Sequence, residues 1–526
     1  GKWPSMFFTQ LNLSSIIALG LAMGWAIAAV GASRQKLGGA KFIELLRRGG
    51  HAPGKHGKMR SQRPKGYSLQ RKGHFGIAQR LMEAFTLPNW LTNWLQHRRS
   101  LRWWRYGVLA VMGAIGLALA VPVFSQQPVT LKLLMAAPDV PAWRNYMVQS
   151  FEASHPNIRL EIVEGPNQVN LLEDLYTTAF LLGDSPYDLV NMDVVWTPKF
   201  AAAGWLRDLT DDFLPAELAV FSQADIAGGQ YQDRLYRLPV RSDAGLLYYR
   251  KDLLEAAGLA PPKTFAELEQ MARSLQSQKA VRWGYLWQGK QYEGAAAMFV
   301  EMLQGFGAFW VNPDTLDVGL DRPEAIQAVN FLKGTIDQGI APPGVTTYVE
   351  EDTRRIFQNG EAAFLRNWPY AWPLFNAEGS PVRGKVGILP LLPADSGKRG
   401  GSCLGGWGLG IAKSSKHPKE ALEAIRYLTS VEAQKPYIIG AGYVPSRKEL
   451  FTEPTVVTAY SHYPLLLNIV QTAVLRPPIA QYAQASDILQ RYLSAALTKQ
   501  LSAEDAMQQA AAETRRLLEA GRAKEG

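Results

Sequence analysis

Hydrophobic and polar positions from residue 128 onward follow two alternating patterns. Residues 130–135 and 158–163 are short runs with apolar residues at every second position or in sequence, which predicts β-strands. Between them, residues 141–154 place large apolar side chains on one helical stripe, which predicts an α-helix. A strand, a helix and a second strand in this order indicate a parallel sheet, because parallel strands need a long crossover connection.

The alternation of predicted strands and helices continues to the end of the chain. Further helices are expected at 171–182, 198–203, 250–258, 265–276, 418–429, 431–438, 485–498 and 503–520, and further strands at 187–192 and 246–249. Thr264 and Glu267 have the spacing of a capping box at the start of helix 265–276. No low-complexity linker interrupts residues 128–526, so we expect an α/β protein whose parts are joined by strand crossings.

Two apolar segments precede this α/β region. Residues 11–31 are uncharged and long enough to cross a bilayer, so they are a candidate transmembrane segment. Residues 98–125 combine arginines, a short apolar core at 108–121 and small residues at the end, which is the pattern of a secretory signal. Cleavage before Gln126 and retention as an uncleaved membrane anchor both remain open, as does the role of residues 1–97.

Composition divides the chain in the same place. The 526 residues are 47% hydrophobic, which is typical of a globular protein, and carry a net charge of +10. Residues 33–106 contain 17 lysines and arginines against two acidic residues, so the basic charge belongs to the N-terminal extension and the remainder is mildly acidic. The single cysteine, Cys403, excludes an intrachain disulfide. Histidines are too scattered to predict a zinc site.

Aromatic residues next to small or polar ones mark the candidate chemistry. Residues 365–372 contain Trp368 and Tyr370, and residues 405–408 contain Gly406 and Trp407. A sugar ring stacks its apolar face on such rings, while its hydroxyls need charged or amide partners. Similar contexts surround Asp193, Trp196, Asp243 and Trp287. The alternative interpretation is that individual rings belong to the hydrophobic core.

Five segments in order carry a resemblance to a known family. They are Tyr187–Trp196, Leu238–Asp252, Trp287–Gly294, Phe357–Ala363 and Gly405–Trp407. Together they resemble the extracellular solute-binding proteins (family 1) of sugar ABC importers, specifically the trehalose/maltose-binding branch, over about residues 128–520.

This resemblance implies a two-lobed periplasmic-binding-protein fold with a ligand held between the lobes. Lobe one would comprise residues 128–240 and 395–438, and lobe two residues 241–390 and 440–526. The chain would cross the hinge three times, near 238–241, 388–392 and 442–446.

Site residues follow from the resemblance where the motifs match. Asp193 and Asp243 resemble carboxylates that accept hydrogen bonds from sugar hydroxyls, and Arg476 resembles an arginine that donates to the ligand. The aromatic and glycine contacts implied are Trp196, Trp287, Tyr292, Trp368, Tyr370, Gly406 and Trp407. The loop with Asp139 departs from the glycine-rich form of the family, which leaves the role of Asp139 open.

The expected function is the substrate-binding component of an ABC importer. It would capture a disaccharide or related α-glucoside, such as trehalose, maltose, sucrose or glucosylglycerol, and deliver it to two permease subunits with a cytoplasmic ATPase. We expect an exported, periplasmic or extracytoplasmic monomer that uses no cofactor or metal and binds no nucleic acid. A membrane-anchored sugar sensor is the first alternative. A glycoside hydrolase using Asp193 and Asp243 is the second, although neither aspartate lies in a recognisable catalytic signature.

Overall fold

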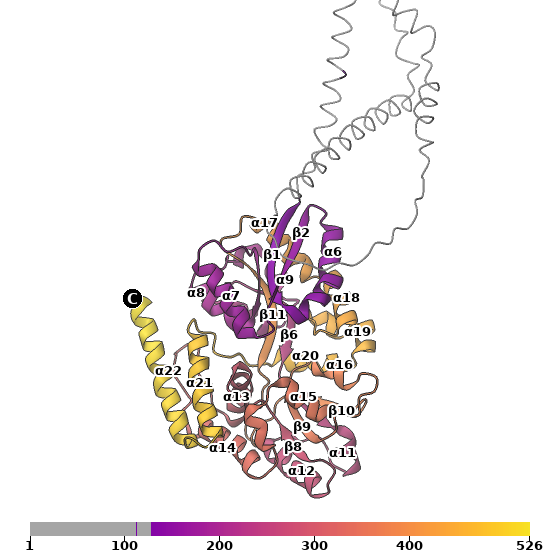
Figure 1. Ribbon diagram of the computed structural model, residues 1–526, viewed down its shortest axis with the longest axis vertical. Coiled ribbons are helices and arrows are strands. Elements are labelled where there is room, and N and C mark those ends of the chain that lie inside the picture. Colours follow the sequence, from indigo (N-terminus) through magenta and orange to yellow (C-terminus); the bar gives the residue numbers. More distant parts are fainter. Residues whose placement is uncertain (1–111, 113–127, 526) are drawn as a thin grey trace, which may run out of the picture. The chain divides into compact units, whose positions relative to one another are not determined.

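The computed structural model describes Met112 and residues 128–525 (Figure 1). The apolar segments predicted at 11–31 and 98–125 lie outside these residues, except for Met112. Within the described part of the chain, no helix combines the length and apolar character needed to cross a membrane.

The first lobe is built on a five-stranded sheet with the strand order β2-β1-β3-β11-β6. Its strands are β1 (Val129–Ala136), β2 (Ile158–Gly165), β3 (Leu189–Asp193), β6 (Leu238–Ala244) and β11 (Leu404–Ile411). Strands β1, β2 and β3 are parallel, which confirms the predicted parallel opening. Strand β11 returns from far along the chain and pairs antiparallel with both β3 and β6.

Helices cover both faces of this sheet. One face packs on Trp143, Phe151, Ile425 and Tyr437, and the other on a cluster of aromatic side chains that includes Tyr176. The predicted helix 141–154 is one continuous helical run, but a π-helical turn forms its centre. The helices of this lobe are η2 (Ala137–Asp139), α5 (Val140–Ala142), η3 (Trp143–Val148), α6 (Gln149–Ser154), α7 (Val169–Leu181), η4 (Val194–Trp196), α8 (Thr197–Ala202), η5 (Thr210–Asp212), α9 (Pro215–Leu218), α10 (Gln223–Ala227), α17 (Pro418–Leu428) and α18 (Val431–Ala441). A two-stranded ribbon of β4 (Gln230–Tyr231) and β5 (Arg234–Leu235) completes it.

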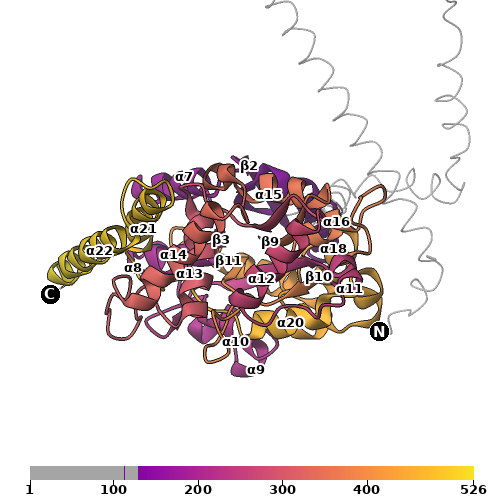
Figure 2. The ribbon, with the colours of Figure 1, turned by 90° about the horizontal axis from the view of Figure 1, so that it is seen from below.

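The second lobe is built on a four-stranded sheet with the order β10-β7-β9-β8. Its strands are β7 (Leu246–Arg250), β8 (Trp283–Leu286), β9 (Ala362–Asn367) and β10 (Val386–Leu389). Its helices are α11 (Lys251–Ala256), α12 (Phe265–Ser277), α13 (Glu293–Phe306), α14 (Pro323–Asp337), η6 (Pro343–Thr347), α15 (Glu350–Gln358), α16 (Ala371–Phe375), η7 (Lys448–Phe451), α19 (Pro454–Ala459), α20 (Tyr463–Gln471), α21 (Tyr482–Leu497) and α22 (Ala503–Glu525). The C-terminal pair α21 and α22 lies against this lobe, seen from below in Figure 2.

Helix α12 starts as predicted, with one difference in its cap. The Thr264 hydroxyl accepts a hydrogen bond from the Glu267 backbone N–H at 3.1 Å. The Glu267 carboxylate, however, accepts from the backbone N–H of Lys263 at 2.7 Å instead of returning to Thr264. The reciprocal half of the predicted capping box is therefore displaced by one residue.

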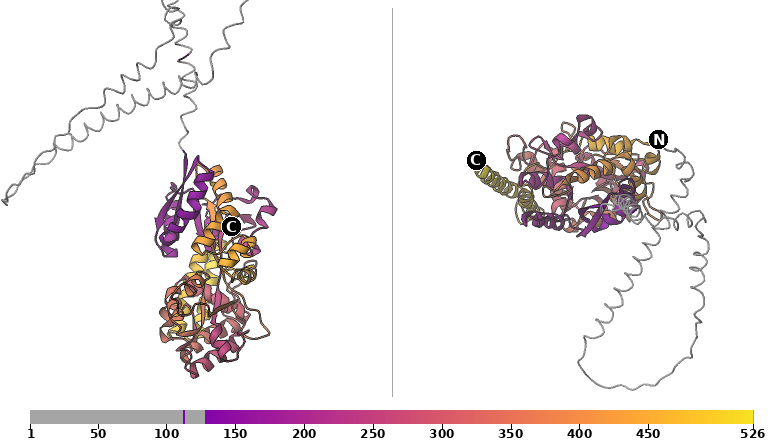
Figure 3. Two further views of the ribbon diagram at one scale, coloured as in Figure 1. Left: turned by 90° about the vertical axis from the view of Figure 1, so that its right-hand side faces the viewer. Right: turned by 90° about the horizontal axis from the view of Figure 1, so that it is seen from above.

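The left view of Figure 3 shows the two lobes one above the other, and the chain passes between their sheets more than once. Strand β6 pairs with β11 as far as Ala244, so the chain leaves the first sheet at Gly245, a few residues after the 238–241 expected near this crossing. The second crossing joins β10 to β11 over residues 390–403, and Gly245 donates its N–H to the Cys403 carbonyl at 3.0 Å. A third passage follows α18, since Tyr437 packs in the first lobe and Val444 in the second.

Candidate functional site

Two carboxylates lie near the ends of strands of the first sheet, on the side of the sheet next to the crossings. Asp193 is the last residue of β3 and pairs with Trp407 of β11, while Asp243 of β6 pairs with Gly405. Both side chains are 14% exposed. Burial raises the pKa of Asp243, the neighbouring Arg241 guanidinium opposes this shift, and the charges of Asp139 and Asp193 add to it. The two aspartates predicted from the sequence are therefore electrostatic neighbours.

Arg241 lies beside these carboxylates, and the sequence interpretation missed it. Its Nε lies 3.0 Å from Asp243 Oδ2, and its Nη1 lies 3.7 Å from Asp139 Oδ1. The guanidinium stacks 4.8 Å from the ring centroid of Tyr443, whose hydroxyl donates to Asp139. Asp139 thus lies beside the two predicted aspartates, in a cluster that offers both donors and acceptors to a polar ligand.

Trp407 lies near the same strand ends, and its ring packs against the ring of Trp196. The two rings meet edge to face with centroids 5.4 Å apart. Trp196 is 2% exposed, whereas Trp407 is partly exposed. Gly406 next to Trp407 has φ +107°, and a Cβ there would lie 2.4 Å from the Arg241 carbonyl oxygen. The backbone therefore requires glycine at position 406, and Trp196 contacts Trp407 rather than solvent.

Trp368 is an aromatic residue of the second lobe that lies close to these side chains of the first lobe. It follows β9, and its indole N–H donates to Glu350 Oε1 at 3.3 Å. A Cβ on Gly405 of β11 would lie 2.9 Å from Trp368 Cζ3 and 3.4 Å from the Asp243 Cβ. The ring of the second lobe therefore touches the strand of the first lobe that carries Trp407.

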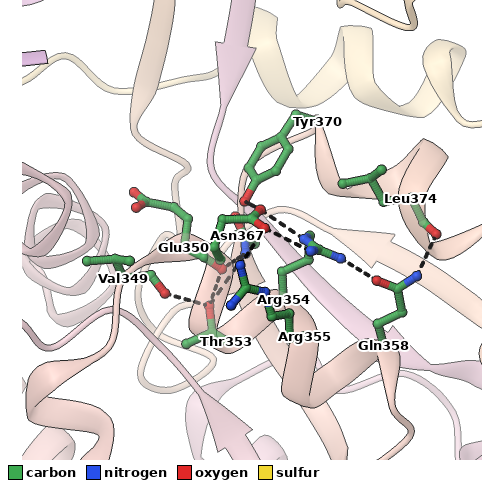
Figure 4. Close-up of polar contacts among 10 residues, drawn as sticks. Val349, Glu350, Thr353, Arg354, Arg355, Gln358, Asn367, Tyr370 and Leu374 are labelled. Carbon is green, nitrogen blue, oxygen red and sulfur yellow. Dashed lines mark hydrogen bonds and ion pairs between the residues drawn. The ribbon is translucent and has the colours of Figure 1, made fainter. Parts of the chain in front are cut away.

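Helix α15 supplies the polar surroundings of the aromatic residues in the second lobe. Tyr370 donates to Glu351 at 2.8 Å, and Asn367 donates to the Glu350 carbonyl at 3.0 Å (Figure 4). The Glu350 carboxylate points away from this network in the figure, and it receives the Trp368 indole N–H. Burial, and then the Glu350 charge, raise the pKa of Tyr292 well above its usual range.

Arg476 contacts both lobes at once. Its Nη2 lies 3.3 Å from Asp193 Oδ1 in the first lobe, and its Nη1 lies 2.7 Å from Glu293 Oε1 in the second. Its side chain is only 4% exposed. Glu293 also accepts hydrogen bonds from Tyr482 and Ser486. A single guanidinium therefore joins the end of strand β3 in the first lobe to the start of helix α13 in the second.

One predicted ligand contact lies elsewhere. Trp287 is completely buried in the core of the second lobe, where its indole N–H donates to Thr335 at 3.2 Å. This placement gives a ligand no access to the ring, because the side chain of Trp287, just after β8, is turned towards α14. The core alternative considered for individual rings thus describes Trp287.

Three charged residues of the site have no counterpart in the sequence interpretation. They are Arg241, Glu293 and Glu350. Arg241 and Glu293 lie inside two of the family-like segments, close to the predicted site residues Asp243 and Tyr292. Their positions in those segments could therefore have indicated them. Glu350 begins an acidic run at the start of a helix, which is common at any helix N-terminus and therefore carries little information.

Within the described residues, no group of three or more histidine, cysteine or acidic side chains could hold a metal ion.

Comparison with known proteins agrees with this arrangement. The model of a family described as bacterial extracellular solute-binding protein matches residues 137–435. A relative from Deinococcus radiodurans named probable ABC transporter-binding protein is 35% identical over 350 residues, which cover 65% of this chain and 82% of the relative.

Solved structures share the fold. Maltose-bound MalE3 of T. maritima is 39% identical with a TM-score of 0.68, over 74% of this chain and 100% of that chain. An ABC transporter solute-binding protein from Thermotoga lettingae, bound with α-D-tagatose, is 27% identical with a TM-score of 0.64, again over 74% and 100%. These relatives are binding proteins and not enzymes, which removes the hydrolase alternative, and their family is extracellular, which agrees with the expected export. The chain belongs to the bacterial extracellular solute-binding protein family.

Proposed function

We propose that this protein is the substrate-binding component of a sugar ABC importer and that its ligand is a disaccharide with an α-glucosyl ring. The observation that carries the proposal is the approach of Trp368 from the second lobe to the strand that pairs with Asp243 and bears Trp407 in the first. Aromatic faces and carboxylates from two lobes at one place suit a molecule with apolar faces and a rim of hydroxyls.

The charges of the site favour a neutral polyol over an ion. Asp139 and Asp243 share Arg241, and Asp193 shares Arg476 with Glu293. Each carboxylate is partly neutralised yet keeps free lone pairs, which accept charge-assisted hydrogen bonds from hydroxyl groups. Leaving such buried groups unpaired penalises a ligand that lacks the matching hydroxyl.

The relatives favour a sugar and leave its identity to be measured. The 39% identical structure holds bound maltose, and the 27% identical one holds α-D-tagatose. Maltose, trehalose, sucrose and glucosylglycerol are the candidates that carry an α-glucosyl ring. We place the ligand contacts at Asp193, Asp243, Trp368, Tyr370, Gly406, Trp407 and Arg476, with Trp196 and Tyr292 supporting them from behind.

Transport would use a population shift between open and closed arrangements of the lobes. A ligand that contacts both lobes stabilises the closed arrangement, because only there do all its contacts form together. Two permease subunits, coupled to a cytoplasmic ATPase, would recognise that arrangement on a monomeric binding protein. Residues 98–125 would direct export, as a cleaved signal or as an anchor, and sequencing the N-terminus of the exported protein distinguishes the two.

Calorimetric titration of the purified chain with maltose, trehalose, sucrose, glucosylglycerol and glucose tests the proposal, with chromatography of each mixture afterwards. We expect one or two disaccharides to bind at micromolar or lower concentration and to be recovered intact. Trp407→Ala should weaken that binding. The matched control is Trp283→Ala, since Trp283 is a partly buried ring on an edge strand of the second sheet. Binding of no sugar in the panel, or equal effects of both substitutions, would contradict the proposal.

A further inference from the structure

Arg366 and Glu301 form a buried ion pair beneath the candidate site. Arg366 lies on β9 and Glu301 on α13, and both side chains have no exposed surface. Two parallel hydrogen bonds of 2.7 Å join the guanidinium to the carboxylate. This fork-to-fork geometry fixes the plane of the guanidinium as well as its position.

The guanidinium of Arg366 lies against one face of Trp368. Its Cζ is 4.2 Å from the ring centroid, a distance typical of a cation–π contact. Two edges of the same ring are also occupied, by Glu350 at the indole N–H and by Gly405 near Cζ3. A ligand that stacks on Trp368 must therefore use the opposite face of the ring.

The same ion pair is tied to two of the crossings between the lobes. Glu301 Oε1 accepts the backbone N–H of Cys403 at 3.1 Å, and Cys403 accepts from Gly245. A Cβ on Gly245 would lie 1.7 Å from Glu301 Oε1, so the first crossing passes directly over the carboxylate. The crossings and the ring of Trp368 thus share one rigid support.

We propose that Arg366, held by Glu301, is a positioning residue that fixes the plane of Trp368 before ligand binds. This inference rests on the proposed function, since it concerns how the same site meets its sugar. A preset ring saves the ligand the entropy of ordering an aromatic side chain, and loss of the support weakens binding by roughly twofold to tenfold.

A purely structural role makes a different prediction. A buried ion pair can often be replaced by uncharged residues of similar volume without loss of stability. If Arg366 only fills the core, the paired substitution Glu301→Gln with Arg366→Met leaves both Trp368 and the affinity unchanged. The introduced glutamine keeps an oxygen for the Cys403 N–H, and the introduced methionine keeps an unbranched side chain under the ring.

The test combines ¹⁹F NMR of the chain labelled with 5-fluorotryptophan and titration with maltose. The Trp368 resonance is identified by its loss in Trp368→Phe. The matched control is Arg250→Met with Asp252→Asn, which removes another bidentate pair, one that starts from the neighbouring strand β7 and has nitrogen–oxygen distances of 2.8 and 2.7 Å.

We expect one sharp Trp368 resonance in the native protein and the control. In the Glu301→Gln, Arg366→Met variant the ligand-free resonance should broaden or split, and maltose should sharpen it again with lower affinity. Arg366→Lys, which keeps the charge beside Glu301 but loses the planar fork, should broaden it too and serves if the paired variant fails to fold. An unchanged Trp368 resonance in a folded variant overturns the inference.

The two proposals fail separately in this experiment. If neither maltose nor another sugar of the panel binds, the proposed function fails, while the ligand-free resonance still reports whether Arg366 fixes the ring. If sugar binds and the resonance and affinity match those of the control, the positioning role fails alone.

Discussion

Replacing Gly405 with alanine tests the contact between the lobes directly. A Cβ at this position would lie 2.9 and 3.3 Å from two carbon atoms of Trp368 and 3.4 Å from the Asp243 Cβ. The φ angle of Gly405 is not positive, so the substitution adds volume without backbone strain. The ring has little room to retreat, because Arg366 lies on one face and Glu350 holds its N–H. Overpacking of this kind costs about 1–3 kcal/mol.

Urea unfolding of four proteins measures this cost: native, Gly405→Ala, Trp368→Leu and the double variant. We expect Gly405→Ala to lower the free energy of unfolding in the native background and to have much less effect in the Trp368→Leu background, giving a coupling energy of about 1–3 kcal/mol. Gly334→Ala is the control, since its nearest neighbour is the flexible end of Gln338 at 3.4 Å, and it should stabilise the helix by roughly 0.5–1 kcal/mol. An equal cost of Gly405→Ala in both backgrounds would refute the contact.

Further predictions concern the rings and one buried histidine. Trp407→Ala should weaken sugar binding by about 1–3 kcal/mol with a small loss of stability, whereas the buried Trp196→Ala should cost about 3–5 kcal/mol of stability; titration and urea unfolding separate the two effects. Burial lowers the pKa of His462 to about 3, so the protein should lose about 1.4 kcal/mol of stability per pH unit from this residue as the pH falls below about 6.5. In the native protein the rings of His462 and Trp372 stack with centroids 4.1 Å apart, and His462→Phe keeps a ring there but should remove this part of the pH dependence. Unfolding curves between about pH 7 and 4.5 measure the free energy of unfolding of both proteins. The same change in that free energy per pH unit in both would contradict the prediction.

The sequence predicted the elements better than the site. Strands β1, β2 and β3 and the four helices expected at 418–429, 431–438, 485–498 and 503–520 have strong periodicity, and they form within a few residues of their expected bounds. The chain leaves the first sheet a few residues after the expected 238–241 because β6 keeps pairing with β11, a strand that comes much later in the chain. Local patterns do not report such long-range pairing.

Individual side chains at the site were harder to predict for a related reason. Trp287 and Trp407 both lie in or beside strands and close to glycines, yet Trp287 is completely buried in a core whereas Trp407 packs on one and keeps part of its surface exposed. Which side a ring takes depends on the sheet packing on it, and a one-residue change in register reverses it. Arg241 was missed because its role comes partly from Asp139, which is distant in the sequence but 3.7 Å away in space.

We propose that one ligand contacts both lobes at Trp368, Asp243 and Trp407. A crystal structure of the chain with the tightest-binding sugar of the panel tests it most directly. We expect a sugar ring stacked on the face of Trp368 opposite Arg366, with hydroxyls donating to Asp243 or Asp193 and a second contact to Trp407. A sugar bound to only one lobe, or at a place away from these side chains, would contradict it.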